Sequence, residues 1–180
     1  LADSLGDKDK ISDAYSNIGI LLYWQEQFEE ALKYFNLSLA LKKEINDKQG
    51  EALLYNNIGA AYYYLKNYDS VLYNFKYALS IYQELNDLRG QAMPYFNIGE
   101  VYFEKKQDYK NALYHYKKSY DIQLKIGDIN GQAASLSRMG SCHSALKNYS
   151  EAIHMQQQAL QMLREINAPI QLSTVLRDLS

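Results

Sequence analysis

The sequence has 180 residues, of which 47% are hydrophobic, and its 19 basic and 21 acidic residues leave a net charge of -2. This apolar content supports a folded core and excludes a wholly disordered chain. The near-neutral charge argues against nucleic acid as a partner, because binding a polyanion needs a positive field, and no basic amphipathic stretch points to a membrane surface.

Cysteine content and hydropathy indicate the cellular compartment of the protein. The single cysteine, Cys142, cannot form an internal disulfide. No stretch approaches the roughly 18 uninterrupted apolar residues of a membrane-spanning helix, and the first ten residues lack the layout of a signal peptide. We therefore expect a cytoplasmic protein with no membrane insertion.

A short motif recurs along the chain at nearly constant spacing. The tripeptide Asn-Ile-Gly ends at Gly19, Gly59 and Gly99, and an altered version, Arg-Met-Gly, ends at Gly140; these glycines are 40, 40 and 41 residues apart. A set of aspartates keeps the same 40- and 41-residue spacing: Asp47, Asp87 and Asp128. A fixed period of this size indicates a repeat protein.

Each repeat is predicted to contain two helices. Residues 15–22 place a tyrosine, an isoleucine, a glycine and a leucine at i, i+3, i+4 and i+7, which is one face of a helix. After a short polar break, residues 28–39 show the same spacing with phenylalanine, alanine and leucine. The pattern recurs over 55–78, 95–119 and 136–159.

The glycines and aspartates are predicted to have structural roles. A glycine inside a helix costs about 1 kcal/mol relative to alanine, so a column of four needs a compensating contact. We expect Gly19 and Ala31 to let the two helices of the first repeat touch backbone to backbone. We expect the three aspartates to cap the helices that follow them.

These columns of small and large residues resemble the tetratricopeptide repeat. Units of about 40 residues are similar to the longer-repeat subclass of kinesin light chains, spindle-orientation scaffolds and bacterial signalling proteins. The resemblance covers the whole chain and implies an all-α fold, an α-solenoid in which antiparallel helix pairs form a right-handed superhelix. Departures from the pattern are Val71, Ser38 and Ser119 at alanine positions, and His143 and Gln156 at aromatic positions.

The repeat predicts one solenoid fragment over residues 1–180. Residues 1–5 align with the tail of a second helix, and four complete repeats follow at about 8–46, 47–86, 87–127 and 128–167. Residues 168–180 align with the start of a fifth repeat. We therefore expect a piece of a longer array.

No arrangement of residues predicts catalysis. The three histidines fall in different helical settings, with no carboxylate or cysteine at metal-ligand spacing. The sequence has no nucleophile elbow, no phosphate-cradling glycine loop and no HExxH helix. We expect no enzyme, no metal and no cofactor.

The face of each first helix opposite its predicted core is unusually apolar. Surface helices normally carry charged residues there, and exposed apolar faces mark binding grooves. The resemblance implies that first helices line the concave side of the superhelix. The predicted peptide-binding residues are Asn17, Tyr23, Trp24, Asn56, Asn57, Tyr63, Tyr64, Phe96, Asn97, Glu100, Phe103 and Arg138.

One asparagine column has a role that only the resemblance implies. In the longer-repeat scaffolds, an asparagine two residues before the glycine contacts the backbone of an extended peptide. Asn17, Asn57 and Asn97 match that column and Arg138 departs from it. An amide suits this role because it offers both a donor and an acceptor. The alternative is that these asparagines bridge neighbouring helices.

Charge on the same face predicts the kind of partner. Asp13, Glu100 and Glu104 oppose only Arg138, so we expect a mildly acidic groove. The lysines and arginines with which the family's co-chaperone members grip a C-terminal carboxylate are nearly absent, so we expect no such clamp. The predicted ligand is a protein or peptide segment with an apolar anchor and basic residues. Two alternatives remain: a sensory or autoregulatory domain of a larger signalling protein, such as a histidine kinase or nucleotide cyclase, and a structural solenoid that self-associates through its ends.

Overall fold

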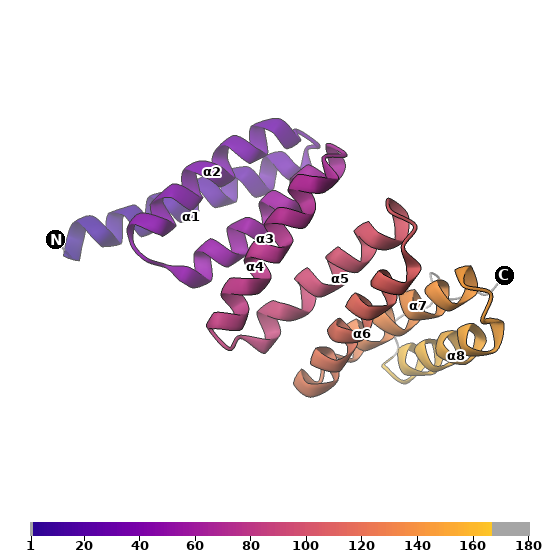
Figure 1. The fold of residues 1–180 in the computed structure, drawn as a ribbon. Helices are drawn as coiled ribbons and strands as arrows, with labels where there is room; N and C mark the ends of the chain where they lie inside the picture. The colour runs from indigo at the N-terminus through magenta and orange to yellow at the C-terminus, as the bar shows by residue number, and fades with distance from the viewer. Residues whose placement is uncertain (1, 167–180) are drawn as a thin grey trace. The chain divides into compact units, whose positions relative to one another are not determined.

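The computed structural model describes residues 2–166, which form eight α-helices with no strand among them. In chain order (Figure 1) these are α1 (Ala2–Trp24), α2 (Phe28–Glu44), α3 (Lys48–Tyr64), α4 (Tyr68–Glu84), α5 (Leu88–Glu104), α6 (Tyr109–Ile126), α7 (Ile129–Ala145) and α8 (Tyr149–Glu165). Consecutive helices pack as the pairs α1–α2, α3–α4, α5–α6 and α7–α8. The predicted all-α fold of helix pairs is confirmed.

The chain divides into two compact units, Leu1–Asp87 and Leu88–Ser180. In the first unit, Phe35 of α2 and Ile58 and Ala61 of α3 belong to one buried cluster. In the second unit, Tyr116 of α6 and Met139 of α7 share another. Each core therefore forms where the second helix of one repeat meets the first helix of the next. The division of the whole chain into four repeats of a single solenoid stays a prediction.

Short turns with one recurring geometry connect the helices. A non-glycine residue with positive φ occurs in most of them: Glu26, Asn46, Lys66, Asn86, Gln107 and Lys147. Asp47 accepts a hydrogen bond from the Gly50 amide at 2.9 Å, and Asp128 accepts one from the Gly131 amide at 3.0 Å. These bonds satisfy amides at the starts of α3 and α7, so the expected caps at Asp47 and Asp128 are confirmed.

In the first three repeats, the glycine column makes room for an aromatic ring of the second helix. A Cβ atom at Gly19 would lie 2.6 Å from the ring of Phe35, and one at Gly59 would lie 2.8 Å from the ring of Phe75. The third repeat has the same arrangement. The ring of the second helix therefore occupies the space that a side chain at the glycine would take, which the sequence did not reveal; the close contact between the two backbones stays a prediction.

The fourth repeat departs from this packing. A Cβ atom at Gly140 would lie 3.1 Å from the Gln156 side chain and 3.2 Å from the Ala152 carbonyl oxygen. Gln156 stands where the other repeats have a ring, and its amide is hydrogen-bonded to the hydroxyl and the carbonyl oxygen of Ser137, both at 3.1 Å. At Gly140 a backbone atom of the second helix is thus among the nearest neighbours, in place of a ring.

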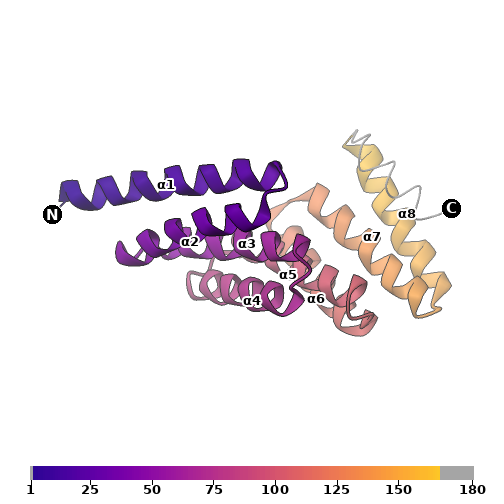
Figure 2. The same ribbon diagram turned by 90° about the horizontal axis from the view of Figure 1, so that it is seen from above.

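The predictions made for the two ends of the chain have different outcomes. α1 is one uninterrupted ribbon (Figure 2), so residues 2–5 continue this helix instead of ending a separate one. The backbone does not turn at Gly6, in contrast to the aligned Asn46 and Gly127, which have positive φ. The predicted fifth repeat at 168–180 lies outside the described residues. Among residues 2–166, no helix is long and apolar enough to cross a membrane.

Candidate functional site

An aromatic pair spans the turn inside three of the four repeats. Near the end of the first helix, Tyr23, Tyr63 and Phe103 each pack against the ring that opens the second helix. The partners are Phe28, Tyr68 and Tyr109, with centroid distances of 5.5, 6.3 and 5.3 Å and steep interplanar angles of 74°, 73° and 64°. Rings in this edge-to-face arrangement attract one another beyond their shared burial. The pairs therefore stiffen the ends of the first helices, where predicted site residues lie.

In the first unit, two of these pairs merge into an aromatic cluster. Tyr64 of α3 stacks on Phe28 of α2 at 4.7 Å with an interplanar angle of 7°, and it meets Tyr23 edge-on at 5.6 Å. Trp24 meets Tyr23 edge-on at 5.8 Å. The aromatic cluster consists of Tyr23, Trp24, Phe28, Tyr63, Tyr64 and Tyr68.

Two rings of the aromatic cluster face solvent. Trp24 exposes 76% of its surface and Tyr64 exposes 55%, whereas Tyr23 and Phe28 are half-buried. Burial, together with its hydrogen bond to Tyr64, raises the pKa of Tyr23 well above its usual value, so its hydroxyl stays protonated. The structure thus joins four predicted residues (Tyr23, Trp24, Tyr63 and Tyr64) in one apolar surface.

The two predicted asparagine positions of α3 lie in different environments. Asn57 is half-buried at the surface, as Asn97 is in the second unit, and Asn17 is exposed. Asn56 is only 7% exposed, so it is not a surface residue, contrary to the expectation. One residue corresponds to about 100° around a helix, and this rotation turns the Asn56 column toward the second helix. The equivalent Phe96 accordingly packs on Tyr116, at 5.3 Å between centroids.

A charged cluster lies beside the asparagine column in the first unit. The ammonium of Lys42 on α2 lies 2.6 Å from Asp9, 2.9 Å from Asp13 and 3.1 Å from Asp47. Its side chain is 9% exposed. Although burial favours the neutral amine, these three carboxylates raise the pKa of Lys42 well above its usual value. One lysine therefore ties α1 and α2 to the start of α3 and leaves two negative charges in surplus.

A hollow of about 380 Å³ opens at this charged cluster. Its walls include Asp13 and Ser16 of α1, Lys42, and Gln49 and Leu53 of α3. Asp13 lies on the face predicted to bind ligand, and Leu53 is the residue of α3 at the same place in the repeat, 40 positions later. The hollow therefore places an acidic rim next to an exposed leucine.

In the second unit, two predicted ligand contacts bind each other. Arg138 of α7 donates to the Glu100 carboxylate of α5 at 2.8 Å, and the Tyr116 hydroxyl of α6 donates to the same carboxylate at 2.5 Å. Burial raises the pKa of Glu100 above its usual value, although Arg138 and Tyr116 favour the charged form. Glu100 and Arg138 thus connect neighbouring repeats, and their charges largely cancel. From the sequence we predicted that both residues contact the ligand, because a pairing between repeats cannot be seen in the sequence.

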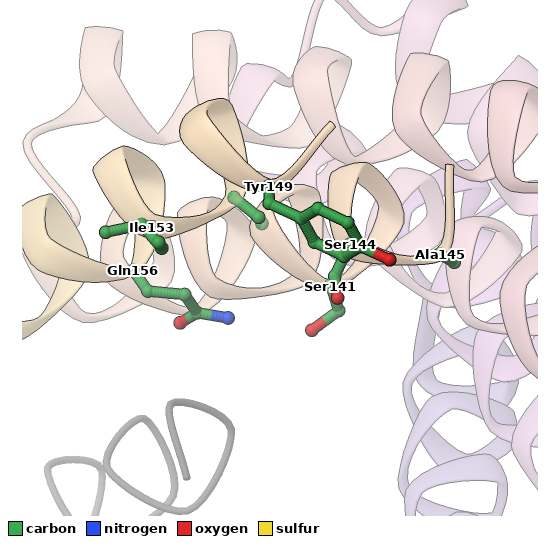
Figure 3. A pocket seen from close by; sticks show the side chains of 8 residues that line it. Ser141, Ser144, Ala145, Tyr149, Ile153 and Gln156 are labelled. Atoms are coloured by element: carbon green, nitrogen blue, oxygen red, sulfur yellow. The ribbon is translucent and has the colours of Figure 1, made fainter. Parts of the chain in front are cut away.

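A hollow in the fourth repeat was not anticipated. It measures about 460 Å³ and lies between α7 and α8 (Figure 3). Figure 3 shows side chains that line it, among them Tyr149 and Ile153 of α8 and Ser141 and Ser144 of α7. The aligned positions could have revealed it: Ser144 stands where Tyr23, Tyr63 and Phe103 make their pairs. Without that ring, the turn of the fourth repeat is open.

Neither a metal site nor a reactive thiol is found among residues 2–166. Residues 2–166 contain no group of three or more histidine, cysteine or acidic side chains that could hold a metal ion. Cys142 is buried, and burial raises the pKa of its thiol to about 12. A thiol with this pKa carries almost no thiolate at neutral pH and is a poor nucleophile.

The sequence matches the family model described as tetratricopeptide repeat over residues 10–84 and 90–165. The two matched segments together cover more than half of the chain and contain residues of all eight described helices. A search of curated protein sequences finds no match.

Solved structures share the fold at low sequence identity. BtubC from P. vanneervenii has a TM-score of 0.81 at 18% identity, with 89% of this chain and 66% of that chain covered. Aspartyl phosphate phosphatase F from Bacillus subtilis has a TM-score of 0.88 at 14% identity, with coverage of 93% and 44%. A Rap protein complexed with Competence and Sporulation Factor has a TM-score of 0.73 at 20% identity, with coverage of 89% and 45%. The chain thus spans less than two thirds of each of these proteins.

Proposed function

Because this chain belongs to the tetratricopeptide repeat family, we propose that it is a binding module that holds a peptide or a segment of another protein and catalyses no reaction itself. Stacked repeats create extended surfaces suited to long, narrow ligands. The segment lies in the concave groove that first helices line in this family. The complex of a Rap protein with Competence and Sporulation Factor, a structure of similar fold, is consistent with this class of function.

The observation that carries this proposal is the exposed part of the aromatic cluster. The rings of Trp24 and Tyr64 are exposed to water, although they contact the half-buried rings of Tyr23 and Phe28. Tryptophan and tyrosine are the side chains that most often anchor protein interfaces, because they bury much apolar area at little cost in conformational entropy. An apolar side chain of the ligand therefore anchors at Trp24 and Tyr64.

A basic residue next to the anchor suits the charges around this surface. Glu26 lies two residues after Trp24, and Glu29 follows Phe28 directly. The surplus of carboxylates around Lys42 adds negative charge in the same unit. A lysine or arginine of the ligand also gains cation–π attraction from an exposed indole. Asp13 and Glu100, two of the three acids expected with Glu104 to supply this charge, are already paired with Lys42 and Arg138.

The asparagine column supplies the backbone contacts in this proposal. The amides of Asn17 and Asn57 hydrogen-bond to peptide groups of the extended ligand, and each bond contributes roughly 1 kcal/mol net. Their surface positions in α1 and α3 support this assignment over a purely structural role.

Tryptophan fluorescence tests the proposal directly, because Trp24 is the only tryptophan in the chain. Arrayed peptides that combine a leucine or aromatic anchor with a neighbouring lysine or arginine are screened first, and the peptides that bind are titrated while Trp24 emission is followed. We expect saturable binding with a blue-shifted emission. Tyr64→Ala should weaken the affinity by about tenfold or more, since a buried interface anchor is worth more than about 1.4 kcal/mol.

A matched control distinguishes binding at this site from nonspecific binding to exposed aromatic residues. Tyr73 on α4 is as exposed as Tyr64 and lies outside the aromatic cluster, so Tyr73→Ala should leave the affinity unchanged. Asn57→Ala should weaken binding of every peptide by a similar factor, whatever its side chains. Binding that leaves Trp24 emission and the Tyr64→Ala affinity unaltered would move the site to another surface.

A sensory role within a larger signalling protein is the alternative use of the same surface. In that case the ligand binds at the aromatic cluster and changes the activity of a domain outside this chain. Full-length protein with Tyr64→Ala would then lose its response to the ligand while its basal activity is unchanged.

A further inference from the structure

The hollow at the charged cluster lies at a junction between two repeats within the first unit. Its walls come from α1 and α2 of the first repeat and from α3 and α4 of the second. Asp13 and Ser16 of α1 and Gln49 and Leu53 of α3 are among its lining residues. Its volume of about 380 Å³ is within the range of known ligand pockets. It is therefore large enough to receive a whole side chain of a ligand.

The charge around this hollow is suited to a cation. Lys42 compensates one of its three carboxylate partners, and the other two leave a negative surplus. The side chains of Asp9 and Asp13 are 50% and 61% exposed. A carboxylate has about four acceptor sites, so Asp13 can contact both Lys42 and a second cation in the hollow.

The second unit packs its helices without these charges. Arg89 and Met93 stand where the first unit has Asp9 and Asp13, and Gln123 stands where it has Lys42. Gln123 is hydrogen-bonded to Ser135 of α7, with 2.7 Å between the two side-chain oxygens. The helix pairs therefore form with either set of residues, and the negative surplus is a property of this one junction.

An apolar side chain lies beside the charges. Leu53 of α3 lines the hollow and is 51% exposed. Lysine and arginine have an apolar stem and a charged end, and they bury the stem against apolar surface while the charge stays hydrated or paired. A basic side chain thus fits both features, with its stem on Leu53 and its charge at Asp13.

The hollow and the aromatic cluster lie at opposite ends of α3. One stripe of this helix joins them, with residues at intervals of four, three and four: Leu53, Asn57, Ala60 and Tyr64. At 1.5 Å per residue, the distance to Tyr64 is roughly 16 Å from Leu53 and roughly 22 Å from Gln49. An extended ligand rises about 3.3 Å per residue. It therefore needs about five to seven residues to reach from one end to the other.

We infer that the hollow binds a lysine or arginine of the ligand, about five to seven residues away in its sequence from the side chain that anchors at Tyr64. This inference rests on the proposed peptide binding and adds a second subsite to it. Asn57 lies between the two subsites on the same stripe, where it can contact the backbone of the connecting residues.

A lysine scan of the ligand tests the inference. The anchored peptide with the highest affinity from the screen is first stripped of basic residues, which are replaced by serine. A single lysine is then introduced at each position in turn, on both sides of the anchor, and binding is measured by titration. We expect a maximum of affinity at a spacing of about five to seven residues on one side, about fivefold above the lysine-free peptide. This gain should shrink at high salt.

Variants of the protein locate the lysine. Asp13→Asn should bind the best lysine peptide no more tightly than the lysine-free peptide. Asp121→Asn changes the net charge equally, at an exposed acid of α6 outside the hollow, and should keep the fivefold gain. Asp13→Lys should reverse the preference, so that a glutamate at the same position of the peptide binds better than the lysine. A mere loss of folding cannot produce this reversal.

The outcomes separate the inference from the proposed function. If the lysine-free peptide binds but no spacing gives a maximum, or if the maximum survives in Asp13→Asn, the inference is overturned and the proposed function stands. If no peptide binds, both are overturned. If the lysine peptide binds equally well after its anchor is replaced by serine, the hollow is a separate cation site and the inference of one shared ligand is wrong.

Discussion

The first and the fourth repeat have the same pair of helices and differ in what fills the turn between them. In the first repeat, Tyr23 packs edge-on against Phe28, and Phe35 lies against Gly19. In the fourth, the aligned residues are Ser144 opposite Tyr149 and Gln156 against Gly140. One turn is part of an aromatic cluster, whereas the other borders a hollow of about 460 Å³.

This difference shows that the backbone of the repeat does not depend on the aromatic residues. Both helix pairs form, with α2 and α8 each 17 residues long, although one lacks the ring pair and the ring on glycine. The conserved helix geometry comes from the periodic apolar face and the turns. The rings instead determine which surface is apolar, exposed and available to a ligand.

The largest expected effect concerns the glycines. Gly19→Ala drives a Cβ atom to 2.6 Å from the ring of Phe35, which is buried and cannot move away easily, so we expect a loss of about 2–3 kcal/mol of unfolding free energy. Gly140→Ala meets the Gln156 side chain at 3.1 Å, and the higher helix propensity of alanine offsets about 1 kcal/mol. Urea denaturation followed by circular dichroism measures both. Equal losses would show that the packing of the two repeats does not differ.

The second effect concerns position 42, where the fourth repeat has Leu163. Lys42→Leu removes three ion pairs and leaves Asp9, Asp13 and Asp47 without their cation. We expect a loss of about 2 kcal/mol, because the lysine is buried while two of the aspartates remain well solvated. The loss measured by denaturation should shrink at high salt, which screens the repulsion between the carboxylates. A loss that is independent of salt would indicate lost packing instead.

A third test exchanges the turn residues of the two repeats. Tyr23→Ser removes the pair with Phe28 and should cost about 1.5 kcal/mol, whereas Ser144→Tyr builds a pair with Tyr149 and should gain about 0.5–1 kcal/mol. Thermal melts of the single variants and of the double exchange measure both changes at protein concentrations where the chain is monomeric. A destabilising Ser144→Tyr would mean that Tyr149 is not positioned like Phe28.

The smallest expected effects are differences between the two units in how the free energy of unfolding depends on pH. The raised pKa of Glu100 means that its contribution to stability is present below its ordinary value of 4.5 and is lost as the pH rises through the folded-state value. For Asp47, burial favours the neutral acid, but hydrogen bonds from the Gly50 amide and Lys42 lower the pKa below 3.8. Its contribution is therefore present above 3.8 and is lost as the pH falls through the folded-state value.

Isosteric variants test these opposite signs. Glu100→Gln should remove a loss of stability that the wild type shows on raising the pH from about 4 toward neutrality. Asp47→Asn should be destabilised relative to wild type at neutral pH and should approach it in strong acid. Urea denaturation across this range measures both curves. Parallel curves for the two variants and the wild type would contradict the assignment.

Several features of the fold followed from local sequence. The helix pairs follow from the spacing of residues such as Tyr15, Ile18 and Leu22, because a helix face repeats every 3.6 residues. The caps at Asp47 and Asp128 were predictable because capping involves residues three positions apart. The exposed rings Trp24 and Tyr64 were found by the same angular argument.

The candidate site was predicted less well, because its errors involve contacts between repeats. Asn56 is buried, although it is only one residue from the half-buried Asn57. Its burial depends on how the neighbouring helices pack against α3. Glu100 and Arg138 lie 38 residues apart and neutralise each other. No periodicity within a single repeat encodes such a pairing.

The sequence by itself determined the period, the helices, their caps and the aromatic composition of the first helices, because these depend on interactions within a few turns of the chain. Only the tertiary structure decided which of those side chains face solvent and which pair with a neighbour. Tyr23 and Ser144 occupy the same place in the repeat, yet one belongs to a cluster and the other borders an open hollow. The reason is that exposure depends on the volumes of side chains from several helices, which meet only after the helices have packed.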